Sequence, residues 1–416
     1  MQDIYSVLLL GLFTGAVFRI LAHFTKDRPL SFVRGPKSPS FVFGHLLDLN
    51  HSERAGELER RWVYTYGQAC RIKGSFGQDL LLLADPKALH HIFHVSGHRY
   101  PKPADVNESI KLIMGRGIFS AVGDDHKRHK KIMIPAFEPS RIRSFLDLFH
   151  SSANKLAQYW EDEIQRTNGS IPINVYTGIS HLMLDNIGEG IADGFMLPGK
   201  ATILFRFLWR FISTGMLGVI QHIPARQIRR LRHFLMVCKQ TAKEVLEKRS
   251  NERDSAEDKK DMLSSLVRSN ASADIKRNLD EDELLSQIAT IMFAGHDSTS
   301  NSLAWLLYDL ACHPKDQERL REEIARVKSQ SPNPQELTIP ELKGMEFTNA
   351  VMRESLRLHP MAFSLPRIAA EDDVIPLATP IRTTKGGFIS AVPVKKGQYI
   401  QVSVYTYNRQ VIQTQS

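Results

Sequence analysis

The spacing of apolar and polar residues predicts that most of the chain is helical. Apolar residues recur at helical spacing in segments 53–66, 124–137, 140–166, 176–193, 226–250, 281–311, 314–328 and 347–358. Pro86 starts a further helix that runs through His94. Short strand patterns appear at 69–76 and 79–84, joined by a turn at Gly77, and return after about residue 361. The pattern therefore predicts a mainly α fold with a small β portion near each end.

The segment 281–311 predicts an unusually long helix. Asp280 and Glu283 have the spacing of a capping box at its start. About 32 residues at 1.5 Å per residue give a length of roughly 48 Å. A helix of that length must cross the centre of a domain of this size.

The middle of this helix carries residues that weaken a helix. Gly295 costs about 1 kcal/mol relative to alanine, and Ser298 and Thr299 can bond to backbone carbonyl groups and loosen the helix. Asp297 is unfavourable to bury without a partner. These penalties coincide at one point, which indicates that something large lies against Ala294 and Gly295. The alternative is a kinked core helix whose polar groups face a water pocket.

The N-terminal segment 4–24 predicts a membrane anchor. It is apolar except for Arg19 and His23, and a spanning helix needs about 20 such residues. Basic residues follow the segment, while Asp3 is the only charge before it. The positive-inside rule therefore predicts a single-pass anchor with the rest of the chain in the cytosol. A cleaved signal peptide is the alternative, although neither a basic n-region nor a cleavage site is evident.

The composition narrows the possible partners of the protein but identifies no chemical site. The chain has 416 residues, 42% of them hydrophobic, and a net charge of +9. Its basic residues are scattered rather than interleaved with aromatic residues, which speaks against nucleic acid and favours an anionic membrane surface as a partner. The cysteines, Cys70, Cys238 and Cys312, form no CxxC pair, so neither a zinc site nor a disulfide framework is predicted.

The sequence Ala294–Gly295–His296–Asp297–Ser298–Thr299 resembles the distal helix of the cytochromes P-450. In that family, small residues leave room for dioxygen above a heme, and the acid and the hydroxyl that follows relay protons. The resemblance assigns the cofactor-binding positions to Ala294 and Gly295 and the catalytic relay to Asp297, Ser298 and Thr299. Ser298 departs from the family because threonine is usual at its position, so its rotamer is less fixed.

Three further segments continue the resemblance. Glu354 and Arg357 match the Glu-x-x-Arg helix of the family, where the pair is buried and structural. Arg367 stands where the family often holds a heme propionate, a task that suits the fork of a guanidinium. His126 and Lys130 stand at the usual Trp-x-x-x-Arg positions and could also bind a propionate. The alternative for them is a solvated basic face together with Lys127, Arg128 and Lys131.

One family motif is missing. The heme iron of the family is held by a cysteine thiolate in a late Phe-x-x-Gly-x-x-x-Cys loop, and none of the three cysteines has that context. No metal ligand is therefore assigned. The late Pro-x-Arg segment that would complete the Glu354/Arg357 triad has no counterpart either. We therefore expect a cytochrome P-450 fold that lacks its Cys loop and last helix, with 4–24 as anchor and 29–416 as a truncated domain.

The resemblance implies a heme-thiolate monooxygenase of the fungal membrane type, supplied with electrons from NADPH by a flavoprotein reductase. It implies the endoplasmic reticulum membrane, an apolar small-molecule substrate and, by association, terpenoid or other secondary metabolism. Substrate positions are expected around 100–120, 205–220 and 361–366, with apolar residues Ile110, Ile113, Met114, Phe205, Phe211 and Phe363. Plain core packing explains most of these residues equally well. The alternative function is an inactive, membrane-tethered remnant that does not bind heme normally.

Overall fold

A computed structural model describes residues 30–143, 145–166, 173–183, 203, 233, 235–244, 247, 262–271 and 278–410. The chain forms two compact units, each described here by itself. The first contains Met1–Ser109, Gly190–Arg230 and Ala362–Ser416, and the second contains Ile110–Glu189 and Leu231–Met361. The expected anchor at 4–24 lies outside the described residues. Among the helices that the structure describes, none has both the length and the apolar character needed to cross a membrane.

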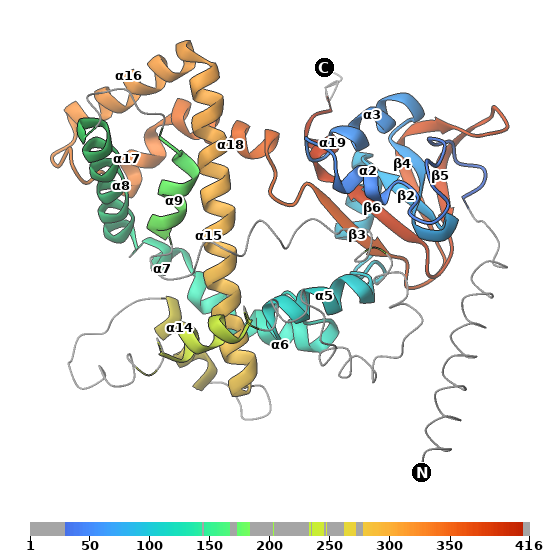
Figure 1. Ribbon diagram of the computed structural model, residues 1–416, viewed down its shortest axis with the longest axis horizontal. Coiled ribbons are helices and arrows are strands. Elements are labelled where there is room, and N and C mark those ends of the chain that lie inside the picture. The colour runs from blue at the N-terminus through green and yellow to red at the C-terminus, as the bar shows by residue number, and fades with distance from the viewer. Residues whose placement is uncertain are drawn as a thin grey trace. The chain divides into compact units, whose positions relative to one another are not determined.

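The first unit contains both sheets (Figure 1). Its elements are α2 (Leu46–Asn50), α3 (Glu57–Tyr66), β1 (Ala69–Lys73), η1 (Ser75–Gly77), β2 (Asp79–Leu83), α4 (Pro86–His90), the π-helix η2 (His91–Val95), the start of α5 (Ala104–Met114), β3 (Ser364–Ile368), β4 (Asp373–Arg382), β5 (Phe388–Val394), β6 (Tyr399–Ser403) and α19 (Val404–Asn408). The four-stranded sheet has the order β1-β2-β6-β3, and β4 pairs with β5 in a second sheet.

The four-stranded sheet is buried on both faces because β2 is apolar at successive positions. Leu81 and Leu83 join one core with residues of β4, β5 and β6. Leu80 and Leu82 join a second core with Trp62 of α3. Successive side chains of a strand point to opposite faces, so the four leucines of β2 supply both cores. The predicted strands around the Gly77 turn are confirmed, and Gly77 has φ +74°.

Buried carboxylates tie the segments of the first unit together. Asp85 caps α4 by accepting the amide protons of Lys87 and Ala88, and it also accepts those of Ala378 and Thr379 on β4. Its side chain thereby joins residues that are nearly 300 positions apart in the sequence. An unpartnered buried carboxylate would be strongly unfavourable, so these four amide groups are required for Asp85 to be buried as it is.

The second unit is helical, and α15 is its long central rod (Figure 1). Its elements are the end of α5, α6 (Gly123–Met133), η3 (Ile134–Phe137), α7 (Pro139–Arg143), α8 (Leu146–Arg166), α9 (Val175–Met183), α14 (Met262–Ala271), α15 (Glu281–Cys312), α16 (Pro314–Gln330), α17 (Ile339–Gly344) and α18 (Glu346–Leu358). Helices α9 and α18 pack against α15. Ile132 and Met133 of α6, Leu266 of α14 and Ile288 of α15 share one apolar core.

The predicted mainly α fold with small β portions is confirmed, as is the long helix with its capping box. Helix α14 was not predicted, because charged residues flank this short amphipathic segment, in which Leu266 is fully buried. The last strand, β6, ends at Ser403, because Ser403 caps the short helix α19 through the amide of Thr406.

Candidate functional site

The middle of α15 has open space where the sequence predicts it. Gly295 is exposed, and a Cβ atom built on it would have no described heavy atom within 4 Å. Ala294 beside it is half-buried. No bulky described side chain fills the space next to Gly295.

The hydroxyl groups around Gly295 bond to the helix itself. Ser298 donates to the carbonyl oxygen of Ala294 at 2.6 Å, and Ser302 donates to that of Ser298 at 2.8 Å. The expectation that Ser298 bonds to the backbone is confirmed, and this contact holds its Oγ near Ala294. Thr299 is half-buried. Asp297 is helical, but its side chain lies outside the described set, so its catalytic role stays a prediction.

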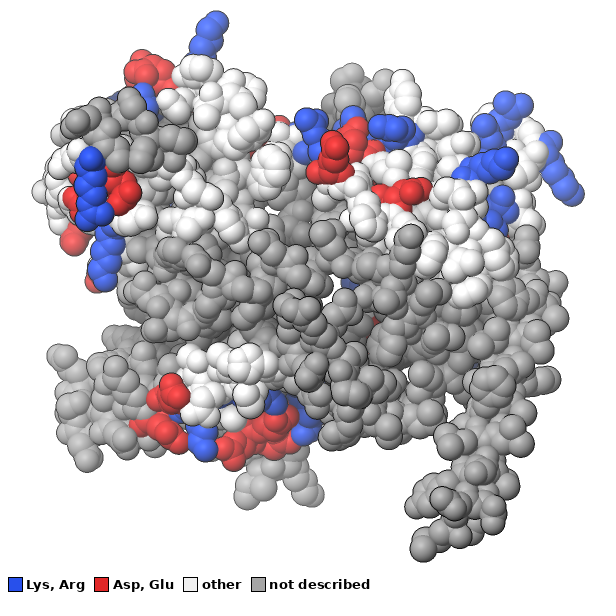
Figure 2. All heavy atoms as spheres, viewed as in Figure 1, with Lys and Arg blue, Asp and Glu red and all other residues white. Residues whose placement is uncertain are grey.

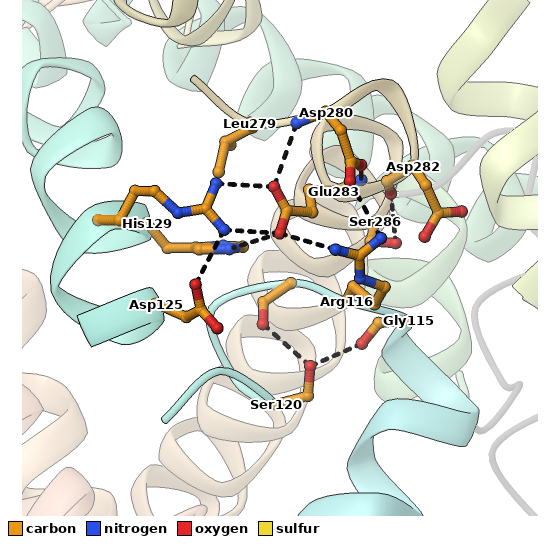
Figure 3. Close-up of polar contacts among 12 residues, drawn as sticks. Gly115, Arg116, Ser120, Asp125, His129, Leu279, Asp280, Asp282, Glu283 and Ser286 are labelled. Atoms are coloured by element: carbon orange, nitrogen blue, oxygen red, sulfur yellow. Dashed lines mark hydrogen bonds and ion pairs between the residues drawn. The ribbon is translucent and has the colours of Figure 1, made fainter. Parts of the chain in front are cut away.

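The N-terminal turn of α15 holds a dense polar cluster around Glu283 (Figure 3). Arg128 of α6 donates to both carboxylate oxygens of Glu283, at 2.8 and 2.7 Å. Arg116 donates to the same carboxylate at 3.1 Å, and the Nε2 atom of the buried His129 lies 3.6 Å from it. The pKa of Glu283 is lowered to about 2, with the hydrogen bonds from Arg128 as the largest cause. The cluster, which we call the Glu283 cluster, ties α6 to α15.

The alternative of a solvated basic face on α6 is confirmed in part. Lys127, Lys130 and Lys131 are exposed, whereas Arg128 is ion-paired with the buried carboxylate of Glu283. Lys130 is exposed and His126 is half-buried, and at helical spacing they share a face opposite to that of Arg128. The propionate-binding role of His126 and Lys130 stays a prediction.

Arg367 lies in the first unit on β3, partly buried. Its guanidinium donates to the carbonyl oxygen of Pro366 at 2.8 Å and lies 5.1 Å from the ring centroid of Phe93. Lys102 is near it, because Ile368 donates its amide proton to the carbonyl oxygen of Pro101 at 3.0 Å. Burial lowers the pKa of both cations, and Arg367 further lowers that of Lys102.

The two cations lie close together, and burial disfavours the charged form of each. The carboxylate-binding role expected for Arg367 stays a prediction. Sequence inspection missed Lys102, because only the pairing of residues 99–101 with β3 brings it to Arg367.

Glu354 and Arg357 form the expected pair on α18, with hydrogen bonds of 2.7 and 2.6 Å. The expected burial is not seen, because their side chains are 56% and 42% exposed. The residues given contain no counterpart of the late Pro-x-Arg segment that would cover them. The pair lies on the solvent side of α18 in this structure.

The three cysteines do not fit the role of an iron ligand beside Gly295. Burial raises the pKa of the Cys238 thiol to about 11 and that of the Cys70 thiol further still, which opposes the thiolate form that a metal requires. Cys312 is exposed but lies about 25 Å along α15 from Gly295, at 1.5 Å per residue. Two thiols are therefore held in the neutral form by burial, and the third is distant from Gly295 along α15.

Among the described residues there is also no group of three or more His, Cys, Asp and Glu side chains that could hold a metal ion. The residues expected near a substrate are divided between the units. Ile110, Ile113 and Met114 are half-buried on α5, and Phe363 is exposed just before β3. Phe205 and Phe211 lie outside the described residues.

In the helical unit, the long helix α15 has open space among the described residues at its mid-helix glycine. Comparison with known proteins assigns the family. The family profile described as Cytochrome P450 matches residues 33–382. The chain belongs to the cytochrome P450 family, whose chemistry is heme-thiolate monooxygenation.

Proteins described as cytochrome P450 monooxygenases match most of the length of the chain. Cytochrome P450 monooxygenase 205 of Postia placenta is 31% identical over 408 residues, which are 92% of this chain and 74% of the relative. Cytochrome P450 monooxygenase claQ of Ampulloclitocybe clavipes is 29% identical over 424 residues, covering 97% of this chain and 78% of the relative. Cytochrome P450 monooxygenase claU of the same fungus is 30% identical, covering 91% and 73%. The matched region extends over both units.

Proposed function

We propose that the protein is a heme-thiolate monooxygenase that oxidises an apolar small molecule. The observation that carries this proposal is the open space beside Gly295 in the middle of α15, in a chain whose residues 33–382 match the family. Because nothing described fills that space, a porphyrin can approach the backbone of the helix there. Bound heme would supply the activation of dioxygen.

The chain's own residues have separable roles in this proposal. Ala294 and Gly295 leave room above the porphyrin, and Ser298 and Thr299 place hydroxyl groups one turn further along the helix. Arg367 binds a heme carboxylate, in line with its position beside a second cation. We assign the same role to His126 and Lys130, and a proton relay to Asp297, from the family pattern.

NADPH supplies the electrons through a separate flavoprotein reductase. The exposed side chains of Lys127 and Lys131 on α6 would complement an acidic partner surface. We further propose that 4–24 anchors the protein in the endoplasmic reticulum membrane with its body in the cytosol. The substrate is apolar and belongs to terpenoid or other secondary metabolism, a proposal that the half-buried apolar residues of α5 support.

The cysteines favour a second candidate, a membrane-tethered product of these 416 residues that does not bind heme through sulfur. Two of its thiols are buried with raised pKa values, and the third lies far from Gly295. This candidate retains α15 with Gly295 and the neighbouring cations Lys102 and Arg367, but it has no catalytic centre.

One experiment separates the two candidates. The ferrous–CO difference spectrum is measured on the purified 416-residue protein and on the same chain joined to the late Cys-loop segment of a fungal relative. The first candidate predicts a thiolate-type band from the extended chain and loss of that band in its Gly295→Phe variant, which fills the space on α15. The second candidate predicts no thiolate-type band from the 416-residue protein. A thiolate-type band from the 416-residue protein would refute the second candidate. Absence of heme from the extended chain would refute the first.

A further inference from the structure

Histidine is concentrated where helix α4 continues into the π-helix η2. Four histidines, His90, His91, His94 and His98, are near neighbours in the sequence. His91 is occupied, because its Nε2 atom lies 2.9 Å from the carboxylate of Asp373. The side chains of His90 and His94 are exposed, and neither ring forms a hydrogen bond or an ion pair with another described residue. Their ring nitrogens are therefore available to a ligand from solution.

The rings of His90 and His94, which we call the His90–His94 pair, are spaced for one metal ion. Their centroids lie 5.3 Å apart, and the ring planes are 30° from parallel. A metal ion that binds an imidazole nitrogen at about 2.0–2.1 Å lies about 3.2 Å from the ring centroid, so two imidazoles at the tetrahedral angle of about 109° have centroids about 5.2 Å apart. Rotation about the Cβ–Cγ bond, a broad torsion, turns each nitrogen toward the ion and barely moves the centroid. The observed separation therefore suits tetrahedral coordination.

The helix also favours a cation at this position. Residues four apart on a helix lie on one face, which is the spacing by which paired histidines bind zinc in H-E-x-x-H helices. His94 lies in the last turn of η2, where the carbonyl end of a helix attracts positive charge. Imidazole nitrogen is a preferred ligand of Zn²⁺, Cu²⁺ and Ni²⁺, whereas Mg²⁺ and Ca²⁺ prefer oxygen. The pair therefore selects an ion of the first kind.

The turn that such an ion would bridge carries two contacts of the first unit. Between the paired histidines, His91 binds Asp373 of β4, and the Phe93 ring centroid lies 5.1 Å from the guanidinium carbon of Arg367 on β3. The amide and the hydroxyl of Ser96 both donate to the carbonyl oxygen of His91, at 2.9 and 2.6 Å, and close the π-turn. Such turns are rare and frequently lie at functional sites. An ion on the pair would span the junction of α4 and η2 and hold this turn closed.

We propose that the His90–His94 pair is a binding site for a divalent transition-metal ion of the zinc type, completed by water, which stabilises the π-turn of η2. The site lies wholly in the first unit and does not depend on the proposed oxygenase activity. Acidic side chains lie next to basic ones on the face shown in Figure 2, and the described residues include no group of three or more His, Cys, Asp and Glu side chains that could hold a metal ion. No larger described site therefore competes for the ion.

The test is a calorimetric titration of the purified full chain with Zn²⁺ at pH 7.5. It compares the parent protein with His90→Gln, His94→Gln and the double variant. Glutamine is polar and favours a helix, so these exposed positions should tolerate it, and circular dichroism without zinc checks the fold. His98→Gln is the matched control, since His98 is exposed in the same segment but follows the turn at Gly97, which has φ +59°. Titration with Mg²⁺ measures binding that needs no imidazole.

Each single variant should lower the zinc association constant by at least about tenfold, because loss of even a supporting hydrogen bond at a metal site costs about 10–100-fold. The double variant should match the single variants, since either substitution already leaves only one ligand. His98→Gln should bind zinc like the parent protein, and Mg²⁺ should not bind to the pair.

Hydrogen exchange measures the effect of the ion on the turn. At a free Zn²⁺ concentration ten times the dissociation constant, exchange of the Ser96 amide in the parent protein should slow about tenfold. This is the factor 1 + [Zn²⁺]/Kd for a site that is lost when the turn opens. The same amide should not slow in His94→Gln.

Equal zinc affinity of the parent protein, His90→Gln and His94→Gln would mean an adventitious ion only, and this result or the absence of zinc binding would overturn the proposal. An equal loss of affinity in His98→Gln would also overturn it, because the ion would then not be held by the pair. Binding through the pair without slower exchange of the Ser96 amide would contradict the stabilisation of the turn.

Discussion

The replacement Glu283→Gln should destabilise the helical unit substantially. The Glu283 side chain is only 6% exposed and accepts hydrogen bonds from Arg128, Arg116 and the amide of Asp280. Glutamine keeps the shape but removes the charge and one acceptor. Arg128, with a side chain that is 21% exposed, then loses its principal partner.

The magnitude follows from the pKa of Glu283, which falls from 4.5 to about 2. At 1.36 kcal/mol per pKa unit this corresponds to about 3 kcal/mol of differential stabilisation of the ionised form. Loss of one partner of a buried pair gives a comparable value, about 3–5 kcal/mol. We therefore expect the free energy of unfolding at pH 7 to fall by about 3 kcal/mol.

The same group makes a specific contribution to the pH dependence. Its pKa is lower in the folded state than in the unfolded state, so its stabilisation is complete above about pH 4.5 and is lost as the pH falls toward 2. The difference between the parent protein and Glu283→Gln should therefore shrink across that window. Urea unfolding in detergent, followed by helical circular dichroism, measures both effects.

The control is Glu354→Gln, which breaks an exposed pair on α18. The side chains of Glu354 and Arg357 are 56% and 42% exposed. Loss of this ion pair should therefore change the free energy of unfolding by less than about 1 kcal/mol. The reasoning about the Glu283 cluster would be refuted if the two variants had equal effects, or if the effect of Glu283→Gln at pH 7 persisted unchanged at pH 3.

Three further outcomes are expected. Gly295→Ala should stabilise the protein by about 1 kcal/mol in the same unfolding assay, since the new Cβ meets nothing and alanine favours the helix; a loss of stability would show that the space is filled. Lys102→Met and Arg367→Met should each weaken binding of protoporphyrin IX, measured by porphyrin fluorescence. Neither variant should change binding of the dimethyl ester of this porphyrin, which lacks free carboxylates. Equal weakening of both ligands would argue against a carboxylate site. In native protein treated with iodoacetamide, mass spectrometry should find Cys312 modified and the two buried cysteines protected, and modification of all three at one rate would contradict their burial.

Several features of the site could be predicted from the sequence because they depend on neighbouring residues. The capping box of Asp280 and Glu283 and the Glu354/Arg357 pair join residues three positions apart, and both form as expected. The back-bond of Ser298 to Ala294 likewise lies within one helical turn. Helical geometry fixes such distances whatever the rest of the chain does.

Partners that are far apart in the sequence could not be predicted in this way. Arg128 and Glu283 are 155 positions apart, and no periodicity distinguishes Arg128 from the exposed lysines beside it. Lys102 and Arg367 meet only because residues 99–101 pair with β3. The burial of the Glu354/Arg357 pair was expected by resemblance and is not seen, because burial depends on the segments that cover a helix.

The sequence by itself determined the helical class, the long central helix with its glycine, and the residue types that identify the family. Each of these depends on local spacing, which the backbone converts directly into one helical face or one strand. The tertiary structure alone decided which charges are paired and which thiols are buried. Those properties arise from contacts between distant segments, whose free energies depend on desolvation and on partners that no short stretch of sequence contains.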